Sequence, residues 1–174
     1  RELAPNFNKK FVALHTHLLP GLVGGTRMNP EGVKTGNEAD VDEVVEIETD
    51  VKMSKSKPES AIFIHDSEDE IKKKISKAFC PEKIGKGNPI YEIAEYLVLR
   101  DKHMKIERPA KFGGDLEIVD SEELKNIYEQ GKLHPMDLKG AVSRELIEIL
   151  KPSRDYFAKH KEYLEQIKGV EITR

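Results

Sequence analysis

Helix start and stop signals follow one another closely from residue 66 onward, and they leave little room for a fold that is not mainly helical. Ser67 and Glu70 have the spacing of a capping box. Acidic residues fill the first turn and lysines the last, as the helix dipole favours. Ile71 and Ile75 then share one face. We therefore predict a helix over 66–80.

The same reasoning predicts further helices toward the C-terminus. Asn88 suits a cap and Pro89 a first helical position for a helix over 87–99. The predicted buried stripe of that helix comprises Ile90, Ile93, Ala94 and Leu97. Later helices are expected over 121–131, ended by Gly131, and over 134–150, and a last one opened by Pro152. Two short strands around a Gly-Gly turn are expected within 104–120.

The front of the chain has a different pattern. The apolar run at 9–15 is typical of a buried strand of a parallel sheet, and "AIFI" at 61–64 predicts a second short strand or an extended segment. The stretch 24–50 is rich in acids and is expected to be mostly loop, with a possible strand over 41–49. We thus expect an α/β part over 1–65 and a mostly α domain over 66–174.

Composition excludes several classes of protein. The net charge is -3, so any nucleic-acid partner would have to meet a local basic patch. The single cysteine, Cys80, permits no internal disulfide and no zinc cluster, and we expect it to be buried and inert in a reducing, cytoplasmic protein. No run approaches the roughly 20 apolar residues of a membrane helix, so no membrane partner is expected. No resident metal is expected either.

A lysine-rich loop, "KMSKSK" at 52–57, precedes the second predicted strand. Lysine ammonium groups can follow the charge of a moving phosphate, which makes Lys52, Lys55 and Lys57 candidates for nucleotide binding. Short lysine and serine strings are also common on solvated surfaces, and composition alone favours that simpler interpretation.

The order of the residues changes this weighting. "KMSKS" is identical to the second signature of class I aminoacyl-tRNA synthetases. "KAFCPEK", "RPAKFGGDLEI" and "HPMDLKGAVSRELIEILKP" follow in order, and they resemble the C-terminal half of the tyrosyl-tRNA synthetase family, archaeal and eukaryotic type. The resemblance covers nearly the whole chain except 24–50. It implies the end of a Rossmann-like class I nucleotide fold followed by a helical anticodon-binding domain.

This resemblance implies a tyrosine–tRNA ligase, in which tyrosine and ATP form tyrosyl-adenylate and the tyrosyl group passes to tRNA(Tyr). Lys52 and Lys55 would neutralise charge on the ATP phosphates as catalytic residues, with Mg²⁺ accompanying ATP and no prosthetic group. The ATP-binding residues so implied are Lys52, Met53, Ser54, Lys55, Ser56 and His15. For His15 and its neighbour His17, a structural role is an equally good interpretation.

The family resemblance also implies anticodon recognition in the helical domain. Phe112 matches an aromatic that stacks on the first anticodon base, and Asp137 matches a carboxylate that accepts hydrogen bonds from that guanine. His134 matches a residue near the neighbouring base, and Pro135 and Met136 shape the same corner. From the residues alone, Phe112 plugging a core and Asp137 favouring a helix start are the simpler interpretations.

Further cations are candidates for phosphate contacts that position RNA without reading its sequence. The first group lies close in sequence to the anticodon residues and comprises Lys111, Lys132, Lys139 and Arg144. A second group, Lys72 to Lys74, suits an exposed helix face, for which simple solvation is the default interpretation.

The resemblance places the first class I signature and the tyrosine-binding segments before residue 1. We therefore expect a missing N-terminal catalytic portion, a homodimeric complete enzyme and an isolated chain that is inactive. The alternative is a non-catalytic tRNA-binding module, or a subunit that acts with a separate N-terminal chain. A tryptophan-specific relative is disfavoured by "KFGGD" and "HPMD".

Overall fold

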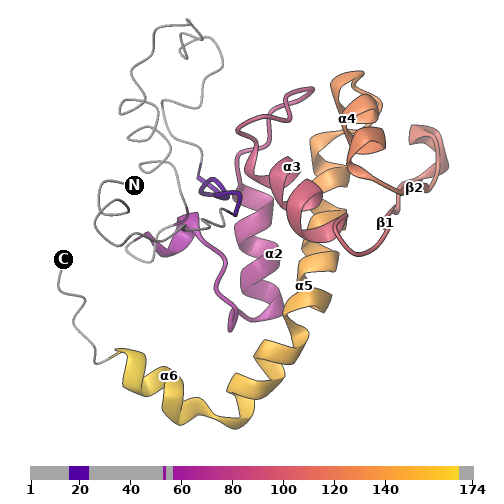
Figure 1. Ribbon diagram of the computed structural model, residues 1–174. Helices are drawn as coiled ribbons and strands as arrows, with labels where there is room; N and C mark the ends of the chain where they lie inside the picture. The colour runs from indigo at the N-terminus through magenta and orange to yellow at the C-terminus, as the bar shows by residue number, and fades with distance from the viewer. Residues whose placement is uncertain (1–15, 24–52, 54–56, 169–174) are drawn as a thin grey trace, which may run out of the picture.

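The computed structural model describes residues 16–23, 53 and 57–168, which form a mostly helical structure with one small sheet (Figure 1). The strand predicted over 9–15 and the acidic stretch 24–50, including its possible strand 41–49, lie outside the described residues. Within these residues, no helix is both long enough and apolar enough to cross a membrane.

Helix α2 (Glu68–Lys77) confirms the first predicted helix and its capping box. The Glu70 amide donates to Ser67 Oγ at 3.3 Å, and the Ser67 amide donates to Glu70 Oε2 at 2.8 Å. Ile71 and Ile75 are buried on the face that turns toward the core. The helix is shorter than predicted because Ala78 already has an extended backbone.

The helix predicted over 87–99 begins as α-helix α3 (Pro89–Ile93) and continues as a π-helical segment (Ala94–Val98). Here the Leu99 amide donates to the Ala94 carbonyl, five residues back, at 2.9 Å. A π turn holds more residues than an α turn and rotates the side chains that follow. Leu97, predicted to be buried, is therefore 41% exposed, and Val98 lies in the core instead.

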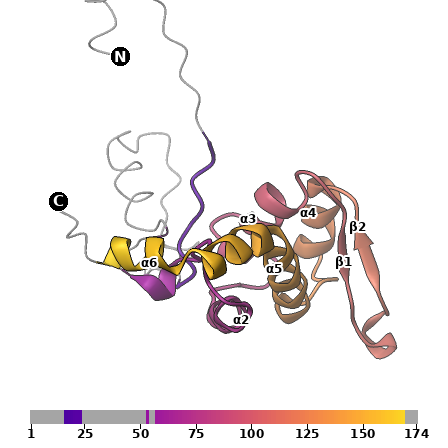
Figure 2. The same cartoon turned by 90° about the horizontal axis from the view of Figure 1, so that it is seen from below.

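The predicted two-stranded element is confirmed. Strands β1 (Met104–Ile106) and β2 (Leu116–Ile118) pair antiparallel, with Met104 opposite Ile118. Helix α4 (Ser121–Glu129) follows, and the Asp120 side chain caps it. In both views, this hairpin and the C-terminal helix α6 (Lys161–Lys168) lie at opposite ends of the structure (Figures 1 and 2).

Helix α5 (Pro135–Lys159) is longer than the sequence predicts. Pro152 was expected to open a new helix, but it lies inside α5, and this prediction is wrong. Proline lacks the amide hydrogen that an interior helical position uses, so its presence costs a hydrogen bond without necessarily ending the helix. The actual break comes at His160, just before α6.

Of the two alternatives for 61–64, the strand is not formed, and Ala61 has an extended backbone. A 3-10 turn at Pro58–Ser60 precedes it. Ser60, just before this segment, is bonded to the N-terminal segment 16–23, because the Leu22 amide donates to the Ser60 carbonyl at 2.9 Å. The Phe79 amide donates in turn to the Leu22 carbonyl at 2.7 Å, so fully buried Leu22 joins this segment to the end of α2.

Helix α5 is the centre of the hydrophobic core, because α2, α3 and β1 all pack against it. Leu138 and Val142 on its inner face are fully buried. Leu146 is 3% exposed, and Leu150 packs at the edge of the core.

Candidate nucleic-acid interface

The turn that joins β1 to β2 presents an aromatic side chain to solvent. A 3-10 turn (Ala110–Phe112) carries Phe112, whose side chain is 59% exposed. Gly113 and Gly114 follow with φ of 100° and 73°, a left-handed conformation that residues with a Cβ rarely adopt. The paired glycines let the chain reverse without covering the ring. Phe112 therefore does not plug the core.

A lysine accompanies this exposed ring. The Lys111 ammonium lies 4.8 Å from the centroid of the Phe112 ring. A cation over an aromatic face is a favourable contact at an exposed position. The same pair of groups offers a flat surface for a base and a positive charge for a phosphate.

Arg108 fixes the position of the turn relative to the rest of the domain. Its Nε donates to the Gly114 carbonyl at 2.6 Å, and its Nη1 donates to the Lys132 carbonyl at 3.0 Å. The Arg108 amide also donates to Asp115 Oδ1 at 3.3 Å. One half-buried guanidinium thus joins the two ends of the turn to the connection between α4 and α5.

The start of α5 is built by a histidine cap. His134 Nδ1 accepts a hydrogen bond from the Met136 amide at 3.1 Å, so the ring proton is assigned to Nε2. That nitrogen lies 3.6 Å from Glu82 Oε1. Pro135 occupies the first helical position and is buried, which suits a residue without an amide hydrogen.

Two side chains leave this corner toward solvent. Met136 is 58% exposed. Asp137 is half-buried in the first turn, and among the described residues no side chain or amide donates to its carboxylate. The dipole of the helix N-terminus favours this carboxylate, and no described group occupies its acceptor positions.

A buried polar cluster supports the segment that contains Glu82. The Tyr128 hydroxyl donates to the Pro81 carbonyl at 2.7 Å, and Asn88 Nδ2 donates to the Tyr128 oxygen at 3.1 Å. Burial raises the pKa of Tyr128, and it also raises the pKa of the half-buried Cys80 thiol 3.3 Å away. A protonated thiol is a poor nucleophile, which agrees with the predicted inertness of Cys80.

Comparison with known proteins identifies the family. A family model described as tRNA synthetases class I (W and Y) matches residues 1–151. The chain belongs to this family.

Archaeal proteins are among the relatives of this class I synthetase chain. It is 50% identical to the tyrosine–tRNA ligase of Thermococcus onnurineus over an alignment of 167 residues. This alignment covers 95% of the chain and 42% of the relative. It is 47% identical over 163 residues to that of Saccharolobus solfataricus, with 93% and 42% covered. The chain thus spans less than half the length of these curated relatives.

Solved structures show the same class I synthetase fold. The tyrosyl-tRNA synthetase of Pyrococcus horikoshii, solved with L-tyrosine, superposes on the chain with a TM-score of 0.75 at 46% identity. The superposition covers 90% of this chain and 40% of the Pyrococcus chain. The enzyme of Aeropyrum pernix superposes with a TM-score of 0.73 at 38% identity, over 98% and 44%.

Most of the lysine loop of this class I synthetase chain is outside the described residues. Lys52, Ser54, Lys55, Ser56 and His15 all belong to the undescribed part. Met53 is half-buried and packs against the core. Where the structure describes the chain, no group of three or more His, Cys, Asp or Glu could hold a metal ion.

His17 makes structural contacts within the described residues, in line with one of the two interpretations given to it above. Its Nε2 lies 2.8 Å from Glu92 Oε2, and its ring stacks on Tyr96 with centroids 3.9 Å apart. Glu92 is 8% exposed and also accepts from the Gly87 amide at 2.7 Å. The histidine therefore ties the front segment to α3.

The other candidate cations of the synthetase chain separate into two groups. Lys74 Nζ lies 2.6 Å from the buried Asp66 carboxylate, so it does not belong to a freely solvated face. Arg144 is also engaged, because its Nη1 lies 3.3 Å from Glu107 Oε2. Lys132 and Lys72 are exposed. The sequence alone could not separate these groups, because the partners lie on other elements.

Proposed function

We propose that this chain is the C-terminal portion of a tyrosine–tRNA ligase, that residues 66–174 bind the tRNA anticodon, and that residues 1–65 end the catalytic nucleotide-binding domain. The proposal draws on the 50% identity to the tyrosine–tRNA ligase of Thermococcus onnurineus. One structural observation carries the anticodon part. Exposed Phe112 and the unpaired carboxylate of Asp137 belong to two segments that Arg108 joins.

The chemistry of these groups suits one purine. The Phe112 ring offers a stacking surface for a base that has left its helix. A carboxylate at Asp137 accepts two hydrogen bonds from the adjacent N–H groups of guanine, the first anticodon base for tyrosine. His134, Pro135 and Met136 would shape the space beside it.

The KMSKS loop would serve the activation step. Lys52 and Lys55 would bind the ATP phosphates and neutralise charge that develops on pyrophosphate, with Ser54 and Ser56 supporting the loop. Mg²⁺ would enter as part of the substrate, held chiefly by the phosphates. Met53 would anchor the loop, which fits its packing against the core. His15 would lie near the adenosine.

The anticodon proposal is tested by changing the first anticodon base. The chain should bind a tRNA transcript with the tyrosine anticodon more tightly than one with the first base changed, by about 1–3 kcal/mol. Asp137→Asn should reduce this difference, because an amide presents one donor group where the guanine needs an acceptor. Glu122→Gln, which neutralises an exposed carboxylate in α4, should leave the difference unchanged. Equal affinity of the parent chain for both transcripts would show that it does not read this base.

A separate measurement tests the catalytic assignment. The 174-residue chain should bind tRNA but should not support tyrosine-dependent pyrophosphate exchange, because the relatives are more than twice its length. The complete enzyme would be a cytoplasmic homodimer with tyrosine, ATP and tRNA(Tyr) as substrates. Exchange that appears only when an N-terminal chain is added would favour a two-chain enzyme. Exchange by the 174-residue chain alone would contradict its predicted inactivity.

A further inference from the structure

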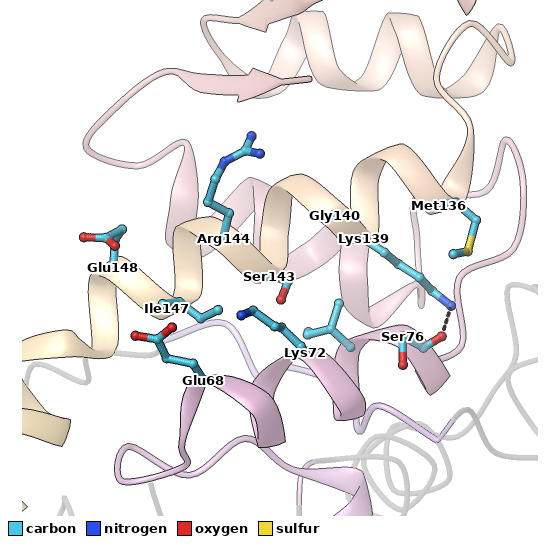
Figure 3. A pocket seen from close by; sticks show the side chains of 11 residues that line it. Glu68, Lys72, Ser76, Met136, Lys139, Gly140, Ser143, Arg144, Ile147 and Glu148 are labelled. Carbon is cyan, nitrogen blue, oxygen red and sulfur yellow. Dashed lines mark hydrogen bonds between the residues drawn. The ribbon is translucent and has the colours of Figure 1, made fainter. Parts of the chain in front are cut away.

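A groove between α2 and α5 lies next to the proposed anticodon surface (Figure 3). Its volume is about 530 Å³. Met136, one of the exposed residues at the start of α5, lines one end of the groove, while Glu68 and Glu148 line the other end. The groove is therefore continuous with the surface assigned above to the anticodon.

A buried hydroxyl group lies in the wall of this groove. Ser143 is 8% exposed, and its Oγ has no hydrogen-bond partner among the described residues. Figure 3 shows the side chain leaving α5 on the side that faces α2. Buried hydroxyls nearly always have partners, so an unpaired one in a groove wall marks a position at which a bound group can accept the missing hydrogen bond. The sequence contained no signal for this residue.

Two ammonium groups give the centre and the Met136 end of the groove a positive charge. Lys72 reaches from α2 toward Ser143 (Figure 3) and has no ion-pair partner within the described part of the chain. Lys139 Nζ donates to the Ser76 carbonyl at 3.0 Å, which holds it at the rim. Arg144 also lines the groove, but its guanidinium is turned toward Glu107.

We propose that this groove binds one phosphate of the tRNA strand that continues from the anticodon, with Ser143 donating its hydroxyl hydrogen and Lys72 pairing with the charge. The inference rests on the proposed function, because the strand must first be anchored at Asp137. Lys139 adds a fixed positive charge at the entrance. Glu148 repels the next phosphate, so the strand leaves the groove before that end, where Glu68 is already paired with Arg154 at 3.7 Å.

Two variants test the groove. Lys72→Gln should weaken binding of a tRNA transcript with the tyrosine anticodon and should lower the slope of log affinity against log salt concentration by about 0.7–0.9, the value for one lost phosphate contact. Ser143→Ala should weaken binding about twofold to tenfold without lowering the melting temperature, because its hydroxyl has no partner to lose in the free protein. The matched controls are Lys161→Gln, an exposed lysine on α6 at the end of the structure away from the β1–β2 hairpin, and Ser153→Ala, farther along α5.

The outcomes separate this inference from the function on which it rests. If both groove variants match their controls while the first anticodon base still matters, the groove inference is wrong and the function stands. The groove would then be left to another occupant, such as an acidic peptide. If the parent chain binds neither transcript, the groove inference and the anticodon proposal fail together. Weaker binding by both groove variants, with the preference for the first anticodon base unchanged, supports the inference that the groove binds a tRNA phosphate.

Discussion

The guanidinium of Arg108 donates to the Lys132 carbonyl across 3.0 Å, and this bond joins the β1–β2 turn to the segment that leads into α5. A second bond runs to the Gly114 carbonyl at 2.6 Å. The proposed anticodon residues come from these two segments, so this side chain helps to fix their spacing, together with the packing of β1 on α5.

Arg108→Lys should therefore disturb RNA recognition more than stability. Lysine keeps the charge but cannot span two carbonyls with a planar group. We expect a loss of about 1–2 kcal/mol in the free energy of unfolding and a reduced preference for the parent first anticodon base. Chemical denaturation and filter binding measure the two effects. Arg100→Lys, at an exposed position, serves as the control, and equal behaviour of the two variants would contradict the role of Arg108.

Asn88→Ala should destabilise the domain by about 2–4 kcal/mol. The side-chain oxygen Oδ1 of Asn88 caps α3 by accepting from the amides of Ile90 and Tyr91, and Nδ2 donates to the Ile84 carbonyl at 2.9 Å. The loss of a cap costs about 1 kcal/mol, and leaving buried partners unpaired adds about 1–3 kcal/mol. Urea denaturation gives the value directly.

The exposed cap of α4 offers a comparison with the buried cap of α3. Asp120 caps α4 by accepting from the Glu123 amide at 2.8 Å, but it is exposed. Asp120→Ala should cost only about 1 kcal/mol, because water replaces the lost bond. Similar losses for the two caps would mean that the buried contacts of Asn88 contribute little.

The stability of the domain should fall between pH 10 and pH 12. Burial, and then the nearby carboxylates of Glu95 and Glu129, raise the pKa of Tyr91 to about 12. The folded state therefore keeps this proton when the unfolded state, with an ordinary pKa near 10, has lost it. The resulting stabilisation is complete below pH 10 and is lost as the pH rises toward 12.

Tyr91→Phe isolates this effect because phenylalanine does not titrate. The free energy of unfolding of the parent minus that of the variant should decrease as the pH rises from 9 to 11 in urea titrations. A constant difference over that range would show that Tyr91 titrates normally in the folded state.

Pro152→Ala should stabilise the protein by about 2 kcal/mol. Alanine restores the amide that proline lacks inside α5, which proline costs about 3 kcal/mol or more. The more flexible unfolded chain of the variant offsets about 1 kcal/mol of this gain. Lys159→Ala, at an exposed position of the same helix, controls for helix propensity. A melting temperature that falls in Pro152→Ala would show that the helix depends on proline here.

The local signals of the sequence predicted helix starts well. The capping box of Ser67, the cap of Asn88 and the glycine turn before β2 all have their predicted roles. Each depends on bonds between residues a few positions apart, and such bonds can be read from spacing. Predictions failed where packing overrode a local rule. Pro152 is carried through α5, and the π turn exchanges Leu97 for Val98 in the core.

The sequence by itself determined the family, the succession of capped helices and the residue types available for RNA. Only the tertiary structure decided which of those residues can meet a ligand. It turned Phe112 outward, engaged Lys74 and Arg144 with carboxylates, and left the buried Ser143 hydroxyl unpaired in a groove beside Lys72. The physical reason is that exposure and pairing depend on contacts between helices far apart in the chain, which no local spacing encodes.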